Sequence, residues 1–349
     1  MRPITVNVTQ RIATSENEET WGVTKLRNEV YVLFHTFNPD RNVSRIRVFQ
    51  DRYPFRLQTD IKADDIKRPI DIGSSEEENC LYVIDDDENC VWKITKEADD
   101  QHKLIKWLTI DYKSYTLSVS RDGELLMINH SSHRLMIYRS DAQLVRSIPL
   151  TADIKNPWHA VEKSIGNFIV SDIPTDAEDD DDEEENEDED DDEDLDQEED
   201  QEDEAEEGDV VTKEGKHTDW LESRPGKSGS IKRKRKMVLV VSELTRDGQV
   251  VVRRFILSNE TQELFDFSYL SIDVDDRVFV ANPVNDTVVL LDSDLKWNRI
   301  MCPTTEEKEE QVIKGPWRLF YDQEMKQLIV AGGCLRVKNQ VNVYTLSLN

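Results

Sequence analysis

A unit of three short strands joined by tight polar turns recurs along this chain and constrains its fold more than any other feature. Its clearest copy runs from Leu270 to Leu291, where runs of β-branched and aromatic residues are separated by turns rich in Asp, Asn and Pro. The interval between the second and third strands is six residues in three copies: Asp85–Val91, Asn129–Leu135 and Asn282–Val288. Such a constant spacing marks an internal repeat.

Six copies of this unit can be aligned on their first strands, at Trp21, Ile70, Leu117, Trp158, Leu270 and Trp317. Successive anchors are 49, 47, 41, 112 and 47 residues apart. A period in the forties with four strands per unit is typical of β-propeller blades. Because only the fourth interval is anomalous, the sequence predicts an all-β, six-bladed β-propeller with one large insertion in blade four.

The N-terminal segment supplies a strand that this ring would otherwise lack. The last predicted blade ends at Tyr344–Leu348 with three strands, whereas Ile4–Thr9 alternates apolar and polar residues before the first blade begins. Pairing these two segments would remove an open sheet edge at each end of the chain. We therefore expect the N-terminal strand to close the last blade rather than to form a frayed tail.

The insertion differs in composition from the rest of the chain. Residues 173–236 contain 30 acidic and 9 basic residues, a net charge of −21, whereas the remaining 44 acidic and 35 basic residues give −9. Between Asp176 and Asp209, 27 of 34 positions are Asp or Glu, a composition that repels itself and has little to bury. We therefore predict a discontinuous propeller domain, 1–172 and 237–349, and a disordered acidic insertion at 173–236.

The blade motifs resemble those of the NHL-repeat family of six-bladed propellers. The matching features are the blade starts and two well-formed strands: Pro69-Ile70, Pro157-Trp158, Pro316-Trp317, Leu81–Asp85 and Val278–Asn282. The resemblance covers nearly the whole chain outside the insertion, and it is to free-standing or tripartite-motif-linked animal propellers. It implies a scaffold that captures partners or substrates.

The same resemblance implies more specialised roles in some relatives. Some NHL propellers read single-stranded RNA on one face, and relatives that carry a RING and a coiled coil act in ubiquitin-ligase systems. The chain enters its first blade almost at once, so we expect no RING, B-box or coiled coil, and at most a role in recruiting a substrate. Several blades lack the family's Asp-rich second turn, so its ligand-binding residues are not carried over.

No catalytic or metal-binding constellation is recognisable in the sequence. It contains no Ser-centred nucleophile elbow and no Gly-rich phosphate loop. His130 and His133 have a spacing that zinc could use, but no third ligand lies nearby. The Asp85–Glu88 turn lacks the glycine and the terminal glutamate of an EF-hand. We therefore expect no enzyme activity, no bound metal and no cofactor.

The cysteines, Cys80, Cys90, Cys302 and Cys334, have neither zinc-type nor Cys-x-x-Cys spacing. If a hairpin turn separates Asp85 from Cys90, then Cys80 lies opposite residues near Thr95, too far from Cys90 for a disulfide. The sequence also shows no apolar signal core and no stretch of about 20 apolar residues. We expect a monomeric intracellular protein, cytoplasmic or nuclear, with reduced thiols and no membrane association.

Three groups of residues are candidates for binding. A local basic patch on one face could include Arg41, His130, His133, Arg134, Arg318 and Lys338. The run Lys232, Arg233, Lys234, Arg235 and Lys236 is typical of a nuclear-import signal or a nucleic-acid patch, and we favour import over a counterweight to the acidic run. Trp220 and Leu221 form a candidate docking motif or simply an exposed apolar pair.

The distribution of charge orders the possible functions. RNA binding requires a dense basic surface, because neutralisation of phosphates supplies most of the affinity, and this chain is net acidic even without its insertion. A ring of loops can capture a protein without special chemistry, and the acidic run favours basic partners. We predict a non-catalytic protein-interaction module, with an RNA-binding propeller and a substrate-recognition component of a ubiquitin-ligase system as alternatives.

Overall fold

The computed structural model describes residues 4–13, 18–36, 43–51, 54–98, 101–172, 235–261, 268–283, 286–296, 298–300, 315–332 and 340–348. All of these residues belong to one compact unit, which combines residues 1–175 with 234–349. Most of the predicted acidic insertion lies outside the described residues. So do several residues singled out in the sequence: Arg41, Trp220, Leu221, Lys232, Arg233, Lys234, Cys302, Cys334 and Lys338.

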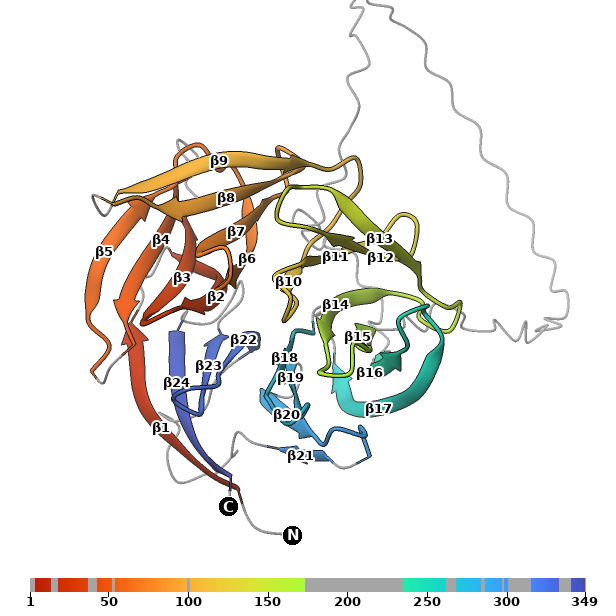
Figure 1. Ribbon diagram of the computed structural model, residues 1–349. Helices are drawn as coiled ribbons and strands as arrows, with labels where there is room; N and C mark the ends of the chain where they lie inside the picture. Colours follow the sequence, from red (N-terminus) through yellow and green to blue (C-terminus); the bar gives the residue numbers. More distant parts are fainter. Residues whose placement is uncertain are drawn as a thin grey trace, which may run out of the picture. The chain divides into compact units, whose positions relative to one another are not determined.

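Within the described ranges, the strands form six four-stranded antiparallel sheets, and there is no α-helix (Figure 1). Sheet 1 contains β2 (Glu19–Leu26), β3 (Glu29–Thr36), β4 (Val43–Gln50) and β5 (Leu57–Lys62). Sheet 2 contains β6 (Pro69–Ser75), β7 (Cys80–Asp85), β8 (Cys90–Lys96) and β9 (His102–Thr109). Sheet 3 contains β10 (Leu117–Val119), β11 (Leu125–Asn129), β12 (Arg134–Tyr138) and β13 (Leu144–Pro149).

The C-terminal half of the chain forms the other three sheets. Sheet 4 contains β14 (Pro157–Glu162), β15 (Phe168–Asp172), β16 (Arg235–Leu244) and β17 (Val250–Thr261). Sheet 5 contains β18 (Leu270–Ile272), β19 (Val278–Asn282), β20 (Thr287–Leu291) and β21 (Asn298–Ile300). Sheet 6 contains β22 (Pro316–Asp322), β23 (Gln327–Gly332), β24 (Gln340–Leu348) and β1 (Ile4–Ala13).

Sheet 6 is therefore built from both ends of the described chain. Strand β1 pairs antiparallel with β24, with Ile4 opposite Leu348 and Ala13 opposite Gln340. This confirms the predicted closing strand, which continues four residues beyond the predicted Thr9. In Figure 1 the two strands run side by side to the N and C labels.

Apolar clusters fill the spaces between neighbouring sheets. On β3, Val30 and Val32 pack with Ile329 of sheet 6. The alternate residues Tyr31 and Leu33 pack with sheet 2. Among the described residues, clusters of this kind join each sheet to the next and join sheet 6 back to sheet 1. Because central strands are covered on both faces, β7, β19 and β20 are buried along their whole length.

The strands on either side of the predicted insertion pair as the repeat requires. Asp172 at the end of β15 lies opposite Val240 of β16. Strand β16 begins at Arg235, however, two residues before the predicted start at Met237. The reason is that β17 extends to Thr261 and provides backbone partners for Arg235 and Lys236. The boundary of the repeat unit therefore falls inside the basic run.

Two of the four cysteines lie in the described residues, and both are buried free thiols. Cys80 lies opposite Thr95, as predicted, and Cys90 lies opposite Asp85. Burial raises the pKa of the Cys90 thiol to about 11. These two thiols are therefore kept in the neutral, unreactive form at physiological pH.

The aspartate at the end of the second strand fixes the start of the first strand in two sheets. The Asp85 carboxylate accepts hydrogen bonds from the backbone N–H groups of Lys67 (2.8 Å) and Arg68 (3.1 Å). Asp172 accepts equivalent bonds from residues 155–156 at 3.2 and 2.7 Å. The recurrence of aspartate at this position in the sequence therefore has a structural cause, because it satisfies backbone donors in the preceding loop.

Candidate functional site

The first strands of the sheets surround the centre of the ring and give it two distinct ends. Each first strand packs against the first strand of the next sheet, and β22 packs against β2. The first strands begin beside the hairpins between second and third strands, since Pro69 pairs with Asp85 and Pro157 with Asp172. The end of the ring at which the first strands begin, beside these hairpins, is called the second-turn end. The first-turn end comprises the turns between first and second strands: 27–28, 76–79, 120–124, 163–167, 273–277 and 323–326.

Arg318 forms a buried hub at the second-turn end. The residue is 2% exposed, although the sequence suggested that it could belong to a surface basic patch, and that expectation is wrong. The guanidinium donates to the carbonyl oxygens of Trp21 (2.6 Å) and Ile70, and Nε lies 3.3 Å from Oδ1 of Asp71. It also lies over the ring of Tyr269, 3.3 Å from the centroid. These contacts connect sheets 1, 2, 5 and 6.

The charges around this hub are controlled by burial. Burial raises the pKa of Asp71 to about 6, against the opposing effect of Arg318. Burial and then the nearby Arg318 lower the pKa of His159 to about 3. His159 Nδ1 accepts a hydrogen bond from the N–H of Leu270 (3.2 Å), so Nε2 carries the proton and donates to the carbonyl of Leu117 (3.3 Å). The neutral histidine thus links sheets 3, 4 and 5.

Aromatic rings cover the hub. Trp21 lies edge-on to Trp317 with centroids 5.7 Å apart, and Tyr115 stacks on Trp158 at 5.4 Å. His130 packs against Tyr115 and Trp158, at 5.0 and 5.5 Å between centroids. Burial, with a smaller effect of His133, lowers the pKa of His130 to about 4. His130 is therefore uncharged at neutral pH and does not supply the cation expected at this position.

The other members of the predicted basic patch lie in one hairpin or outside the described residues. His133 is exposed in the turn between β11 and β12 and has a positive φ of 50°. Arg134 begins β12 and donates to Ser147 on the neighbouring strand, to the hydroxyl at 2.6 Å and to the carbonyl at 2.7 Å. The structure therefore places His130, His133 and Arg134 in one hairpin and buries Arg318 in β22, and it does not describe Arg41 and Lys338.

Further cations at the second-turn end are held by carboxylates. Lys113 Nζ lies 3.0 Å from Asp86 Oδ1, and Arg68 pairs with the other oxygen of the same carboxylate. Arg68 Nε also lies 3.1 Å from Asp87 Oδ1. The acidic turn between β7 and β8 thus neutralises neighbouring positive charge. In the described part of the chain, no cluster of three or more His, Cys, Asp or Glu side chains is arranged to hold a metal ion.

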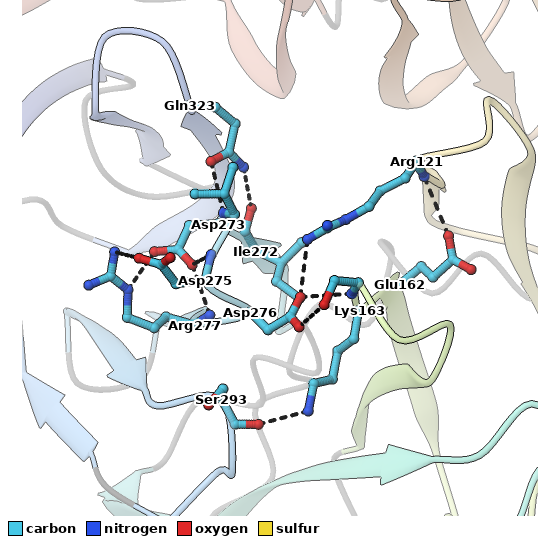
Figure 2. A network of polar contacts seen from close by, with 12 residues as sticks. Arg121, Glu162, Lys163, Ile272, Asp273, Asp275, Asp276, Arg277, Ser293 and Gln323 are labelled. Carbon is cyan, nitrogen blue, oxygen red and sulfur yellow. Dashed lines mark hydrogen bonds and ion pairs between the residues drawn. The ribbon is translucent and has the colours of Figure 1, made fainter.

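The first-turn end is organised by hydrogen bonds that cross from sheet to sheet, as Figure 2 shows. The Asp276 carboxylate in sheet 5 accepts from Arg121 Nη2 of sheet 3 (3.1 Å). It also accepts from both the backbone N–H (2.8 Å) and the hydroxyl of Ser164 in sheet 4. Three first turns therefore meet at one carboxylate.

A second group of bonds extends this arrangement to sheet 6. The Gln323 side chain accepts from the N–H of Val274 (2.9 Å) and donates to the carbonyl of Ile272 (3.1 Å). Within the sheet 5 turn, Asp273 accepts from Arg277 Nε at 2.6 Å, and Arg277 also pairs with Asp275 at 3.0 Å (Figure 2). The turns of sheets 3 to 6 are therefore held together as one surface.

The seam between sheets 6 and 1 carries a buried ion cluster. Lys25 of β2 is 5% exposed, and its Nζ lies 2.8 Å from Asp322, 3.0 Å from Asp51 and 3.3 Å from Glu324. Burial is the largest single influence and lowers the pKa of Lys25, but Asp322 and Asp51 together raise it above its ordinary value. The lysine therefore stays charged and ties the first turn of sheet 6 to sheet 1.

Three consecutive first turns present large exposed apolar side chains. They are Ile165 in sheet 4 (63% exposed), Val274 in sheet 5 (63%) and Met325 in sheet 6 (43%). The other exposed large apolar side chains among the described residues lie on fourth strands: Leu57, Ile105, Leu144 and Val145. The first-turn end is therefore distinguished by apolar side chains on neighbouring, hydrogen-bonded turns.

This end is also acidic. The six first turns contain nine Asp and Glu residues and five Lys and Arg residues, so their formal charge is 5 − 9 = −4. Three of the five cations are engaged: Arg121 with Asp276, Lys163 with Glu243, and Arg277 with its own turn. Sequence inspection missed this surface. The available signal was a single apolar residue within each of three polar turns.

Comparison with known proteins identifies the class of fold but no family. No protein-family model matches the chain, and no curated protein matches it. Within the described ranges, no helix is long and apolar enough to cross a membrane. The solved structures, however, include propeller-like proteins that align with almost the whole chain.

Three of them illustrate the range of activities carried by similar folds. A catalytically inactive variant of virginiamycin B lyase from Staphylococcus aureus with quinupristin is 10% identical, with a TM-score of 0.53, covering 99% of this chain and 100% of that one. The PQQ-bound form of aldose sugar dehydrogenase from Streptomyces coelicolor is 7% identical, with a TM-score of 0.55 and 99% of both chains covered. An auxiliary nutrient binding protein from Bacteroides thetaiotaomicron is 9% identical, with a TM-score of 0.53, covering 99% and 77%.

At these identities the likeness concerns the fold alone. The chain has an all-β, propeller-like fold made of four-stranded antiparallel sheets. Because enzymes and a binding protein share this architecture, the function has to be argued from the side chains of this chain.

Proposed function

We propose that this chain is a non-catalytic protein-interaction module, a six-bladed propeller of the NHL type that binds a partner protein at its first-turn end. The observation that carries the proposal is the exposure of Ile165, Val274 and Met325 on three consecutive first turns. Scattered exposed apolar side chains are ordinary, whereas apolar side chains gathered on one face are typical of interaction sites.

The arrangement of the turns supports binding without rearrangement. Ser164, next to Ile165, is bonded to Asp276, and the backbone of Val274 is bonded to Gln323, two residues before Met325. A surface that is already ordered loses less conformational entropy when a partner arrives. The three apolar side chains can therefore act as anchors on a fixed framework.

The composition of residues 173–236 supports a basic partner. Their net charge of −21 would attract a positively charged protein over a distance and raise its association rate. The same segment carries the candidate docking pair Trp220 and Leu221. It also carries the import run, from which we propose a protein that reaches the nucleus. The test replaces Lys232–Lys234 by alanine, which leaves β16 intact, and compares where the tagged variant and the wild-type chain accumulate. We expect the variant to be lost from the nucleus.

The alternatives have less support. An RNA-binding face needs available cations, but Arg318 is buried, His130 has a lowered pKa, and Arg68 and Lys113 are paired with Asp86. A substrate-recognition component of a ubiquitin-ligase system would be a special case of the proposed role. The identity of the captured partner would decide it.

The proposal is tested by capture from cells, compared quantitatively between two triple variants. The first replaces the first-turn anchors: Ile165→Ser, Val274→Ser and Met325→Ser. The control replaces exposed residues of fourth strands by the same residue type: Leu57→Ser, Ile105→Ser and Leu144→Ser. We expect the first variant to lose a defined set of partners that the wild-type chain and the control retain. An identical set of partners in all three samples would overturn the proposal.

A further inference from the structure

The kind of partner that fits the first-turn end can be read from the charges around its apolar side chains. Val274 is followed by Asp275, and Met325 is preceded by Glu324. The side chains of these two acids are 67% and 76% exposed. Each anchor in sheets 5 and 6 is therefore adjacent to a largely exposed carboxylate, although Asp275 also pairs with Arg277 and Glu324 with Lys25.

Further acids extend this pattern around the ring. Glu76 and Glu77 in the first turn of sheet 2 and Asp122 in that of sheet 3 are exposed. Arg27, Arg121 and Lys326 are exposed cations of the same turns, so the surface is mixed but retains its excess of acids. The exposed Arg246 adds a further cation beside Ile165, because it donates to the carbonyl of Gly166. Lys163, by contrast, is 6% exposed and engaged with Glu243 and the carbonyl of Ser293, so it adds little positive charge to the surface.

From this geometry we infer that the first-turn end takes a cationic protein segment in which Lys or Arg alternates with large apolar residues. This inference deepens the proposed function and rests on it. The apolar residues of the segment would cover Ile165, Val274 and Met325, and its cations would approach Asp275, Glu324 and Asp122. Nucleic acids and anionic membranes carry the wrong charge for this surface.

Recognition of the segment needs both its ionic contacts and its apolar contacts. Contacts between exposed ions are weak, and they mainly select the sign of the partner's charge. The apolar contacts supply affinity, because they remove side chains from water. The surface is thus expected to discriminate against a segment that has only one of the two properties.

The test uses the full-length chain and three fluorescein-labelled peptides of equal length, measured by anisotropy at low and high salt. One peptide alternates Lys and Leu, one alternates Lys and Ser, and one alternates Glu and Leu. Three variants are compared with the wild-type chain. The apolar variant is the Ser triple described above, and the charge variant combines Asp122→Asn, Asp275→Asn and Glu324→Gln. The control removes three acids elsewhere: Glu88→Gln, Asp111→Asn and Asp153→Asn.

We expect the Lys/Leu peptide to bind best. Its Kd should rise at least about tenfold in the apolar variant, as expected when interface anchors are truncated. In the charge variant the Kd of the Lys/Leu peptide should rise about fivefold at low salt and less at high salt, because salt screens exposed charges. The control variant should change the Kd less than about twofold, although it removes the same number of charges.

Three outcomes would overturn this inference, and they separate it from the proposed function. If the Glu/Leu peptide binds best and the apolar variant abolishes its binding, the docking surface stands and the charge assignment is wrong. If the Lys/Ser peptide binds as well as Lys/Leu in every variant, cationic peptides bind elsewhere on the chain. If no peptide responds to the apolar variant and cellular partners are also unchanged, the proposed function fails as well. Retained cooperative unfolding of each variant is the control for folding.

Discussion

The two ends of the ring use arginine in opposite ways. At the second-turn end, Arg318 is buried among aromatic rings and connects four sheets. At the first-turn end, Arg121 has a side chain that is 45% exposed and reaches Asp276 across the neighbouring turn of sheet 4. The comparison teaches that a charged residue on a first strand can lie in the core, whereas a short polar turn without a recognisable motif can present an exposed apolar side chain.

The largest expected difference between the two ends concerns these arginines. Arg318→Met should lower the free energy of unfolding by about 3–5 kcal/mol, because Asp71 would be left as a buried charge without its partner. Arg121→Met should cost less than about 1 kcal/mol, because the Arg121 side chain is 45% exposed and Asp276 keeps its hydrogen bonds from Ser164. Denaturant unfolding checks both values. Equal losses in the two variants would break the comparison.

A second variant sharpens this result. Combining Arg318→Met with Asp71→Leu removes both members of the buried pair and should recover part of the lost stability. No recovery would mean that the hydrogen bonds from Arg318 to the carbonyls of Trp21 and Ile70 dominate its contribution.

The pH dependence of stability should also originate at the second-turn end. The pKa of His159 falls from 6.5 to about 3 on folding, so the stability it contributes is present above pH 6.5 and is lost as the pH falls towards 3. The pKa of Asp71 rises from 3.8 to about 6, so its contribution is present below pH 3.8 and is lost as the pH rises through 6. His159→Gln and Asp71→Asn should therefore change the stability profile in opposite directions.

Urea unfolding at a series of pH values measures these profiles. His159→Gln should reduce the loss of stability between about pH 6.5 and 3. Asp71→Asn should remove a decline between about pH 4 and 6. His133→Gln also removes a histidine, but from a solvent-exposed turn, so as the matched control it should change the profile less than His159→Gln. A profile altered equally by His133→Gln and His159→Gln would contradict the assignment.

A smaller effect is expected from the shared acceptor of the first-turn end. Asp276→Ala should cost about 1–3 kcal/mol, because it removes hydrogen bonds to Arg121 and Ser164 and places Ala at a positive φ of 60°. Amide hydrogen exchange should accelerate in the turns at 120–124 and 163–167. Asp276→Asn is the milder control, because Asn keeps an acceptor oxygen and tolerates this backbone conformation. Unchanged exchange would show that these bonds do not order the turns.

The smallest effect on stability is expected from the apolar side chains themselves. Ile165→Ser, Val274→Ser and Met325→Ser should each change the free energy of unfolding by no more than about 0.5 kcal/mol, as is usual for exposed positions. Differential scanning calorimetry provides the measurement. A loss of several kcal/mol would assign these residues to the core instead of the binding surface.

Much of the fold could be predicted because its rules are local. The six-residue interval from Asp85 to Val91 reflects the hairpin in which Asp85 lies opposite Cys90. The alternation from Ile4 onward was sufficient to predict the strand that pairs with β24, although these segments are about as far apart in sequence as the chain allows. In both cases the pattern of side chains along one strand carries the information.

The candidate site was harder to predict because its contacts are not local. Asp276 receives bonds from residues 112 and 155 positions away, so no short motif reveals that three turns meet there. The burial of Arg318 has the same cause, since its partners come from sheets 1 and 2. The start of β16 at Arg235 depends on the unusual length of β17, which the repeat does not encode.

The pairing of β1 with β24 has a consequence during synthesis. Ile4 is made at the beginning of the described chain and its partner Leu348 at the end, so β1 has no native neighbour until translation of this region is finished. At roughly 5–20 residues per second, that interval lasts roughly 20–70 s. Throughout this time sheet 6 is incomplete and sheet 1 lacks its neighbour on that side. We expect chaperones to shield the unpaired edge of such a nascent chain until its last strand leaves the ribosome.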